Sequence, residues 1–544
     1  MTISFRTYIY VFLELIFFCA CNKEETPVNL PPFVSIEEAK DITRTSAILS
    51  GTVIPNEGST VNRIQFRYGP TPDMQEFVNI SITEKQEVST TLTNLKPGTT
   101  YYYCLEAGNK YSTVCSEIMT FETHPNTIPT VSDLKMLNQG PISITLEYEI
   151  LDDGGEEIIS SGFYLHSEKE PQEQQISLTA HEGNKWKGRI GDLQMDITYY
   201  IQAYATNSIG EIRSKTYQFH TGEAVILTEA GTLNEAIGEQ EKYQFSTLNI
   251  AGPLNGTDIR YLRDMMGINI NGENTSGKLQ ELNLNDASIV AGGISYDGYR
   301  YTVNNIVSHG MFSNCKILQK ITLPANTSVI EENSFENCTA LTILRFSPDT
   351  KEITPSAGCS SLSSLEVPSG SPYFKDIDGV LYNKDATSLI WFPESITNEK
   401  FEVPSSVQNI GAFAFRNCHL QQVILPSSVI NIGKGAFTAS LIESIIIPDE
   451  VATIPYGCFQ LCKQLVSVTL GVNTSYVSEY CFDQCQSLQF LKVKANLFSP
   501  YCLENTFGGA EFLFEKCQLQ VPASSLSIYR NHGIWGKFKK IVGY

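Results

Sequence analysis

Residues 311–324 combine two phrases, Met-Phe-Ser-Asn-Cys at 311–315 and Leu-Gln-Lys-Ile-Thr-Leu-Pro at 318–324. Related phrases return along the chain, and their phenylalanines are Phe335, Phe415, Phe437, Phe459 and Phe482. The spacing is 23 residues from Phe312 to Phe335 and 22 residues from Phe415 to Phe437. A fixed period in the low twenties around L-x-x-I-x-L is typical of a leucine-rich repeat solenoid.

The repeated segment places its aliphatic side chains on one face at strand spacing. A single copy cannot bury this face, but stacked copies can, because each strand pairs with the next in a parallel sheet. Each large aliphatic side chain buried in this way contributes about 1.5–3 kcal/mol. We expect the Ala-Phe or Cys-Phe pair of each copy to form an irregular back side, with Phe inserted into the core.

These phrases resemble the BspA-type leucine-rich repeats of bacterial surface proteins. Residues 371–393 resemble the hairpin insert of that family, and the end of the chain, with Val521, Trp535 and Phe538, resembles its C-terminal cap. The resemblance implies a repeat solenoid over residues 311–544. It also implies adhesion to host matrix or to other bacteria.

The composition argues against nucleic acid as a partner, because the 544-residue chain has a formal net charge of −21. Of its 14 cysteines, seven recur at fixed repeat positions: Cys315, Cys338, Cys418, Cys462 and Cys485 at one position, and Cys458 and Cys481 at another. We interpret these as small buried hydrophobic residues. A metal site is the alternative, but the C-x3-C pairs only repeat the phrase and have no histidine beside them.

Residues 1–21 read as a secretion signal, with Arg6 before an apolar run that ends at Cys19-Ala20-Cys21. The Ala-Cys junction resembles a bacterial lipoprotein cleavage box, which implies a lipid anchor on Cys21 and an outer-membrane location. An ordinary signal peptide is the alternative. Residues 22–25 resemble a signal for display at the cell surface, and 22–32 form a tether.

Residues 33–124 and 126–222 show short alternating strands that predict β-sandwiches. The phrase from Leu95 to Tyr101 resembles the tyrosine corner of fibronectin type III domains, and residues 193–199 repeat it without the proline. Cys104 and Cys115 lie symmetrically about the turn at Gly108-Asn109. We therefore predict that they face each other across a hairpin, where a disulfide is one outcome and two free thiols the other.

Residues 223–310 predict an N-terminal cap and irregular first repeats. Within them, residues 248–252 read as a strand, and a short helix follows with Thr257 or Asp258 as its capping residue.

No nucleophile, phosphate-loop or zinc-hydrolase motif occurs, so we expect no enzymatic activity, no cofactor and no metal. With Ile and Leu inward, the positions that should face outward include Thr322 and Thr469. The candidate binding surface consists of Ile343, Arg345, Ile424, Ile446, Phe490 and Lys492. Exposed apolar residues on such a row can mark a contact surface, and scattered surface residues packed by their neighbours are the alternative.

We therefore predict a mainly β protein, with two Ig-like, fibronectin type III-like sandwiches followed by a leucine-rich repeat solenoid. The expected function is non-enzymatic cell-surface binding of a host extracellular protein or a bacterial surface protein. A glycan-capture accessory lipoprotein of a nutrient-uptake system is the alternative function, and a structural protein without a ligand is the third.

Overall fold

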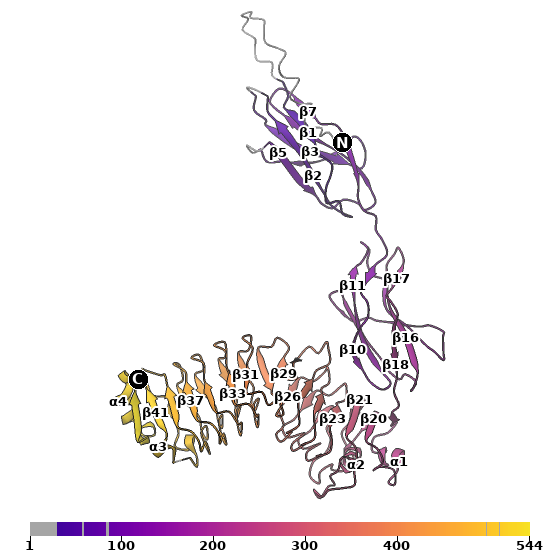
Figure 1. The fold of residues 1–544 in the computed structure, drawn as a ribbon. Helices are drawn as coiled ribbons and strands as arrows, with labels where there is room; N and C mark the ends of the chain where they lie inside the picture. The colour runs from indigo at the N-terminus through magenta and orange to yellow at the C-terminus, as the bar shows by residue number, and fades with distance from the viewer. Residues whose placement is uncertain (1–29, 57–58, 83–85, 497, 511) are drawn as a thin grey trace, which may run out of the picture. The chain divides into compact units, whose positions relative to one another are not determined.

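The computed structural model describes residues 30–544, except 57–58, 83–85, 497 and 511 (Figure 1). Within these residues the chain is mainly β. It divides into two compact units, one of residues 1–131, 150–160 and 205–212, the other of 132–149, 161–204 and 213–544. The predicted signal peptide and the predicted lipidation site, Cys21, lie outside the described residues.

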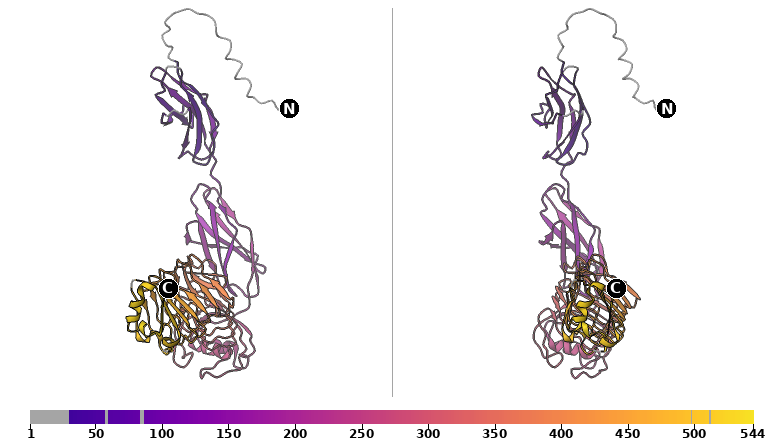
Figure 2. Two further views of the ribbon diagram at one scale, coloured as in Figure 1. Left: turned by 60° about the vertical axis from the view of Figure 1, so that its left-hand side comes forward. Right: turned by 90° about the vertical axis from the view of Figure 1, so that its left-hand side faces the viewer.

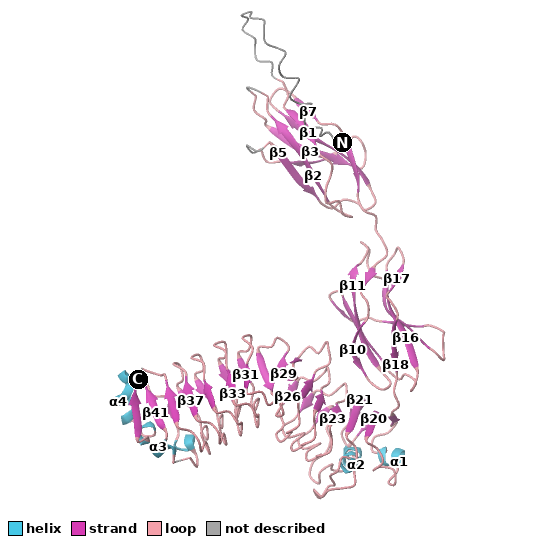
Figure 3. Ribbon diagram, in the orientation of Figure 1, coloured by secondary structure: helices cyan, strands magenta, loops and turns pink. Residues whose placement is uncertain are grey.

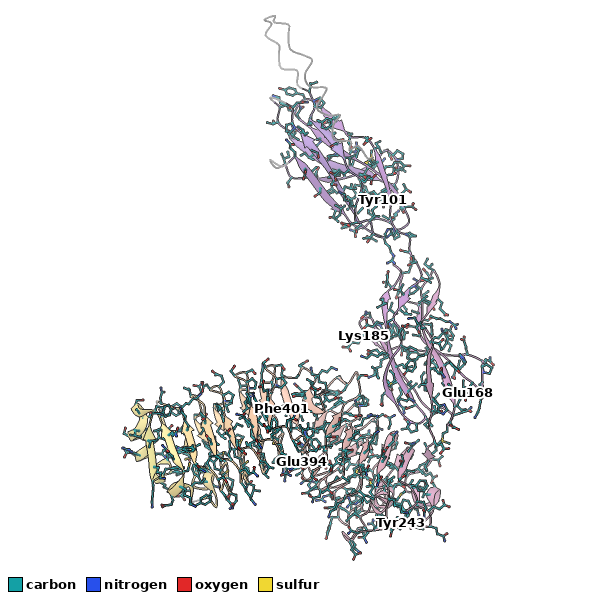
Figure 4. All side chains as sticks on the ribbon, in the orientation of Figure 1. Tyr101, Glu168, Lys185, Tyr243, Glu394 and Phe401 are labelled. Carbon is teal, nitrogen blue, oxygen red and sulfur yellow. The ribbon has the colours of Figure 1, made fainter. Side chains whose placement is uncertain are left out.

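Two sheets enclose the core of residues 33–122. One contains β1 (Phe33–Ile36), β2 (Ala47–Ile54) and β5 (Glu87–Leu92). The other contains β3 (Arg63–Gly69), β4 (Glu76–Asn79), β6 (Thr100–Gly108), β7 (Thr113–Cys115) and β8 (Met119–Glu122). Inward side chains such as Leu49, Phe66 and Tyr103 are fully buried, as the alternating pattern requires. The Tyr101 hydroxyl accepts a hydrogen bond from the Lys96 backbone N–H at 3.0 Å, which ties the β6 entrance to the preceding loop (Figure 4).

A second pair of sheets follows. The first contains β9 (Thr130–Val131), β10 (Lys135–Gln139), β11 (Ile144–Asp152), β14 (His181–Glu182) and β15 (Lys185–Ile190). The other contains β12 (Ser160–Ser167), β13 (Gln174–Ser177), β16 (Thr198–Thr206), β17 (Glu211–Arg213) and β18 (Tyr217–His220). Tyr199 repeats the contact of Tyr101, accepting from the Gln194 N–H at 3.0 Å.

The segment 225–307 opens the solenoid with β19 (Val225–Ile226), α1 (Leu233–Ile237), β20 (Thr247–Leu254), α2 (Gly256–Met265), β21 (Glu281–Ile289) and β22 (Ile306–Val307). The predicted strand and helix are confirmed as β20 and α2, but the predicted cap is wrong. Asn255 caps α2, accepting from the Thr257 N–H at 2.9 Å, and Asp258 closes a capping box. Asp258 is the third helical residue, and its carboxylate also accepts from the Gly231 and Leu233 N–H groups.

Parallel strands then stack coil on coil (Figures 1 and 2). The N-terminal sheet consists of β19, β20, β21, β23 (Lys320–Thr322), β25 (Ile343–Arg345) and β27 (Ser364–Glu366). The C-terminal sheet consists of β31 (Lys400–Glu402), β33 (Gln422–Ile424), β35 (Ser444–Ile446), β37 (Ser467–Leu470), β39 (Phe490–Val493), β41 (Gln518–Val521) and β42 (Lys540–Gly543).

Shorter strands form a second face of the coils. They are β22, β24 (Val329–Ile330), β26 (Glu352–Ile353), β32 (Asn409–Ile410), β34 (Asn431–Ile432), β36 (Thr453–Ile454), β38 (Tyr476–Val477) and β40 (Tyr501–Cys502). The predicted hairpin is confirmed as β28 (Phe374–Ile377) and β29 (Val380–Asn383), and β30 (Ser388–Trp391) joins it to β32. This insert separates the N-terminal sheet from the C-terminal sheet.

The last residues close the solenoid with η1 (Glu504–Phe507), α3 (Leu513–Lys516), η2 (Ala523–Ser525), α4 (Leu526–Asn531) and η3 (Trp535–Lys537). Trp535 and Phe538 pack edge-on against Phe507 at 5.9 and 5.4 Å between ring centroids. The Trp535 indole N–H donates to the Pro500 carbonyl at 2.7 Å, so the aromatic cap leaves no open apolar end at this point.

The helices gather at the two ends of the solenoid, as Figure 3 shows. Among the described residues, no helix combines the length and apolar character that spanning a membrane requires.

Candidate binding surface

The repeat register decides which side chains share a surface. In the C-terminal sheet, one row of paired residues consists of Ile446, Thr469 and Lys492 on successive strands. The neighbouring row consists of Ser444, Ser467 and Phe490 on the same strands. Ile424 precedes Ile446 on the adjacent strand β33. The structure therefore brings together four of the predicted surface residues, Ile424, Ile446, Phe490 and Lys492, which we call the sheet-face set.

Ile446 is the most exposed member of this set, with 63% of its surface accessible, and Phe490 is 40% exposed. Exposure arises because alternate positions of a strand point away from the core, where Ile445 and Ile447 lie buried. Ile424 is only partly exposed. These apolar side chains are more exposed than the buried row of Ile445 and Ile447 on the inner side of the strand.

A shallow cavity of about 400 Å³ lies beside Ile446. Its walls include Leu425, Pro448, Asp449, Glu450 and Lys494. Lys494 Nζ and Asp449 Oδ1 are 3.0 Å apart, and this hydrogen bond lowers the pKa of the Asp449 carboxyl. The cavity thus has an apolar side formed by isoleucine and a charged rim.

Lys492 is not a free charge on this face. Its ammonium group lies over the ring of Tyr544, 3.8 Å from the centroid. This cation–π contact restrains the Lys492 side chain. The charge of Lys492 is therefore shared with the ring of Tyr544.

Ile343 and Arg345 do not join the other four, and the prediction of one continuous surface is wrong on this point. Both are on β25 in the N-terminal sheet, which the hairpin insert separates from the C-terminal sheet. Arg345 is also engaged, because its Nε donates to Glu366 Oε2 at 2.8 Å.

Thr322 was expected to face outward, but it is buried, with 7% of its surface accessible. It pairs with Asn283 on one side and Arg345 on the other. A short side chain between two longer ones is shielded even when its strand position points away from the core.

The hairpin prediction for Cys104 and Cys115 needs correction. Cys115 pairs with Glu106 rather than Cys104, because β7 begins at Thr113 opposite Gly108. Both cysteines are free thiols in this structure. Burial, followed by the neighbouring Cys115 thiol, raises the pKa of Cys104 to about 12. A disulfide between them stays a prediction.

The repeat cysteines are buried, as predicted, and they also form hydrogen bonds. The thiols of Cys338, Cys462 and Cys485 each donate to the carbonyl of a phenylalanine in the preceding coil, at 3.0–3.1 Å. Burial raises the pKa of the Cys418 thiol to about 12, so it stays protonated at neutral pH. Within the described ranges, no group of three or more His, Cys, Asp or Glu side chains is placed to hold a metal ion.

An aromatic and cationic cluster on the turns escaped the sequence reasoning. Lys434 Nζ lies 5.6 Å from the ring centroids of both Phe413 and Tyr456, and Tyr456 contacts Tyr480 edge-on at 5.6 Å. Phe413 and Tyr480 have left-handed backbone conformations, with φ of 59° and 54°. Aligning the repeats could have revealed them, since glycine or asparagine is at the same place in other coils.

The repeat region matches a known protein family. Residues 301–398 and 390–507 match the family model described as "BspA type Leucine rich repeat region (6 copies)". No curated protein matches the chain.

Solved structures similar to this chain include the pneumococcal vaccine antigen PcpA, 17% identical, covering 55% of this chain and 74% of that chain with a TM-score of 0.35. A leucine rich cell surface protein from Faecalibacterium prausnitzii is 18% identical and covers 63% and 97%, with a TM-score of 0.37. A leucine-rich repeat protein from Eubacterium ventriosum is 16% identical and covers 57% and 92%, with a TM-score of 0.34.

The 22- and 23-residue period, the stacked parallel strands and the matching family model all describe the same segment. Residues 301–507 are therefore a leucine-rich repeat region that matches the BspA-type family model.

Proposed function

We propose that this protein is a non-enzymatic binding protein of the bacterial cell surface. It is anchored in the outer membrane by a lipid on Cys21, and fibronectin type III-like sandwiches carry the solenoid. Its partner is a host extracellular matrix protein or a surface protein of another bacterium, bound without a cofactor. Protease treatment of intact cells tests the display, since a surface protein is degraded before lysis.

The exposed Ile446 side chain is the observation that carries this proposal. It lies between the apolar Ile424 and a cavity whose rim carries the Asp449–Lys494 pair. An apolar centre with a polar rim is the usual anatomy of a protein interface, and a few buried anchors supply most of the affinity. The net charge of −21 favours a protein partner over nucleic acid.

The test replaces Ile446 with aspartate in the full chain and measures binding to a panel of matrix proteins and bacterial surface proteins. A carboxylate buried in an interface without a counter-charge costs more than the lost apolar contact, so we expect affinity to fall at least about tenfold.

Ile430→Asp is the matched control, because Ile430 is 44% exposed on a different part of the coil, just before β34. It should leave binding unchanged. Equal effects of the two variants, or no binding by the unmodified chain to any member of the panel, would overturn the proposal.

Glycan capture is the second candidate function, and two tyrosines favour it. Tyr299 and Tyr301 are 86% and 60% exposed on the segment between β21 and β22. Exposed aromatic rings can stack on sugar rings, and a glycan array with Tyr299→Ala beside the unmodified chain distinguishes this function from protein adhesion.

A further inference from the structure

One end of the first pair of sheets, β1–β8, carries large apolar side chains that are exposed to solvent. The strands β1, β3, β5 and β7 begin at this end, and β2, β4 and β6 finish there. It therefore holds the loops 55–62, 80–86 and 109–112 and the point where the chain enters the sheets. The exposed side chains, which we call the tip set, are Leu30, Phe33, Ile54, Ile82 and Tyr111.

The tip set is not part of the folded core. Its members are 39–61% exposed. Among the described residues, they belong neither to the buried cluster of these sheets nor to the residues packed against it, whereas Val61 and Ile80 of the same loops do pack there. In the described part of residues 30–122, the other exposed large apolar side chains are Phe77 and Ile118. Apolar residues gathered at one end in this way mark a contact surface.

Hydrogen bonds and strand pairing hold the members of the tip set together. Asn109 Nδ2 donates to the Leu30 carbonyl at 2.9 Å, and Asn109 Oδ1 accepts from the Tyr111 N–H at 2.9 Å. The loop 109–112 therefore lies beside the entering chain. Phe33 pairs with Ile54 across β1 and β2. The backbone of this end is thus held in place while the apolar side chains remain exposed.

The loops of this end carry little charge, although the whole chain has a formal net charge of −21. Lys110 is the one charged residue among the described residues of the three loops. Its ammonium group lies 4.6 Å from the ring centroid of Tyr111. Aromatic rings, aliphatic side chains and lysine are together what interfacial segments present to the boundary between the headgroups and the acyl chains of a bilayer.

The length of chain before this end indicates what covers it. Leu30 follows the predicted lipidation site, Cys21, by nine residues. A chain spans at most about 3.3–3.6 Å per residue, so the lipid is within about 32 Å of Leu30. The bilayer that holds the lipid is therefore within reach of the tip set.

We propose that the tip set docks on the bilayer that carries the lipid anchor, with its apolar side chains among the headgroups and the upper acyl chains. This inference rests on the lipid anchor of the proposed function. Because a short tether keeps the tip set at a high effective concentration near the bilayer, a weak apolar contact is enough to populate the docked state.

The test produces the full chain in a bacterium that processes lipoproteins and reconstitutes it in phosphatidylcholine vesicles with brominated acyl chains, which quench nearby tryptophan. Tyr111→Trp places a reporter in the tip set. Phe77→Trp is the matched control, because Phe77 is a similarly exposed ring that pairs with Arg67, away from this end. The native tryptophans lie outside the first pair of sheets, so the unmodified chain supplies the signal to subtract.

Interfacial side chains lie about 5–10 Å into the bilayer surface, so bromination should lower the fluorescence of the added tryptophan at least about twofold in the Tyr111→Trp chain. The Phe77→Trp chain should keep its added signal. Phe33→Asp combined with Tyr111→Trp should remove most of the quenching, because a carboxylate is poorly accommodated among acyl chains.

Equal quenching of the two reporters, no quenching at the tip, or unchanged quenching after Phe33→Asp would each overturn the docking while the anchor stands. An unquenched tip is also the result expected if a protein partner or a second copy covers the tip set. A chain that leaves the vesicles and has no lipid on Cys21, by mass spectrometry of its N-terminal peptide, would overturn the anchor and the docking with it. None of these outcomes alters the Ile446 test.

Discussion

At the scale of single residues, the coils repeat a left-handed backbone position that asparagine fills at Asn314, Asn337 and Asn417. Leu461 is at the same place in a later coil, with φ of 63°. A left-handed conformation costs an ordinary L-residue about 1–2 kcal/mol, and asparagine tolerates it better. The later coils therefore accept local strain, which the stacking on both sides of each coil enforces.

Glu394 is a buried carboxyl inside the stack of coils (Figure 4). Its Oε1 accepts from the Gly358 N–H at 2.7 Å and from Asn417 Nδ2 at 3.3 Å. Burial outweighs these hydrogen bonds and raises the pKa of the Glu394 carboxyl above its ordinary value. The folded state therefore favours the protonated form.

This raised pKa predicts a pH dependence of stability. Between the unfolded and the folded pKa of Glu394, the folded chain binds more protons, so rising pH removes stability. Glu394→Gln keeps an acceptor for Gly358 without the charge. We expect the variant to be more stable than the unmodified chain in urea at pH 8. The difference should shrink as the pH falls through the raised folded pKa and be lost below 4.5, the ordinary glutamate value.

Unfolding curves in urea at several pH values measure the effect. Glu402→Gln is the control, since its fully exposed carboxyl has a pKa lowered by the Lys400 hydrogen bond. It should show no gain at pH 8. A Glu394→Gln variant that is less stable than the unmodified chain at every pH would contradict the prediction, because the buried Glu394 carboxylate would then not destabilise the fold.

At the scale of elements, the phenylalanines of successive coils form a continuous stack. Phe437 lies 5.2 Å from Phe415 and 5.6 Å from Phe459, with nearly parallel rings, and Phe482 and Phe507 continue the stack. The stack runs along the core because the repeat period places a phenylalanine ring at the same position in each successive coil. The buried cysteines run beside it and donate to phenylalanine carbonyls.

Phe437→Ala should therefore cost about 3–5 kcal/mol, because it removes a buried ring and leaves a cavity between two coils. Hydrogen exchange should rise mainly in the neighbouring coils, since each coil contacts only its neighbours. Denaturant unfolding and exchange mass spectrometry measure the two effects.

Phe490→Ala is the control for this prediction. Phe490 is 40% exposed on the C-terminal sheet, and surface substitutions change stability by about 0.5 kcal/mol or less. Similar losses for Phe437 and Phe490 would contradict the role of the stack.

At the scale of the larger unit, a polar junction joins the second pair of sheets to the first coils. The carboxylate of Asp286 on β21 accepts from Ser143 and from the Ile142 N–H, so one side chain satisfies a backbone and a hydroxyl donor from the loop between β10 and β11. Ser369 and Gly370 of the solenoid also contact Leu137 of β10.

Gly140 allows this close approach. A Cβ atom on Gly140 would lie 2.4 Å from the side chains of both Asn285 and Asp286. Gly140→Ala should force the junction apart and cost about 1–3 kcal/mol, the usual range for inserting atoms into a packed region. The loss should appear as a lower thermal midpoint and faster proteolysis near residues 221–225.

Gly222→Ala is the matched control at the same junction. Its added Cβ would meet only Pro141, at an ordinary 3.9 Å. It should leave both measurements unchanged. A Gly140→Ala variant that behaves like the control would contradict this prediction, because the junction would then accommodate the added methyl group without losing stability.

Local patterns in the sequence determined the coils. The 22- and 23-residue period, the hairpin at 371–393 and the aromatic end at Trp535 predicted elements that the structure confirms. These succeed because each coil buries its apolar face against the next copy, so contacts between coils follow from the repeat itself.

Only the tertiary structure decided which outward residues share a surface. The hairpin insert divides the strands between two sheets, so Arg345 is separated from Ile446, although the two occupy equivalent positions of their repeats. At the junction, Arg189 Nη2 lies 3.0 Å from Asp286 Oδ1, although the two residues are far apart in the chain. No periodic pattern encodes such a contact, because it depends on how the second pair of sheets packs against the first coils.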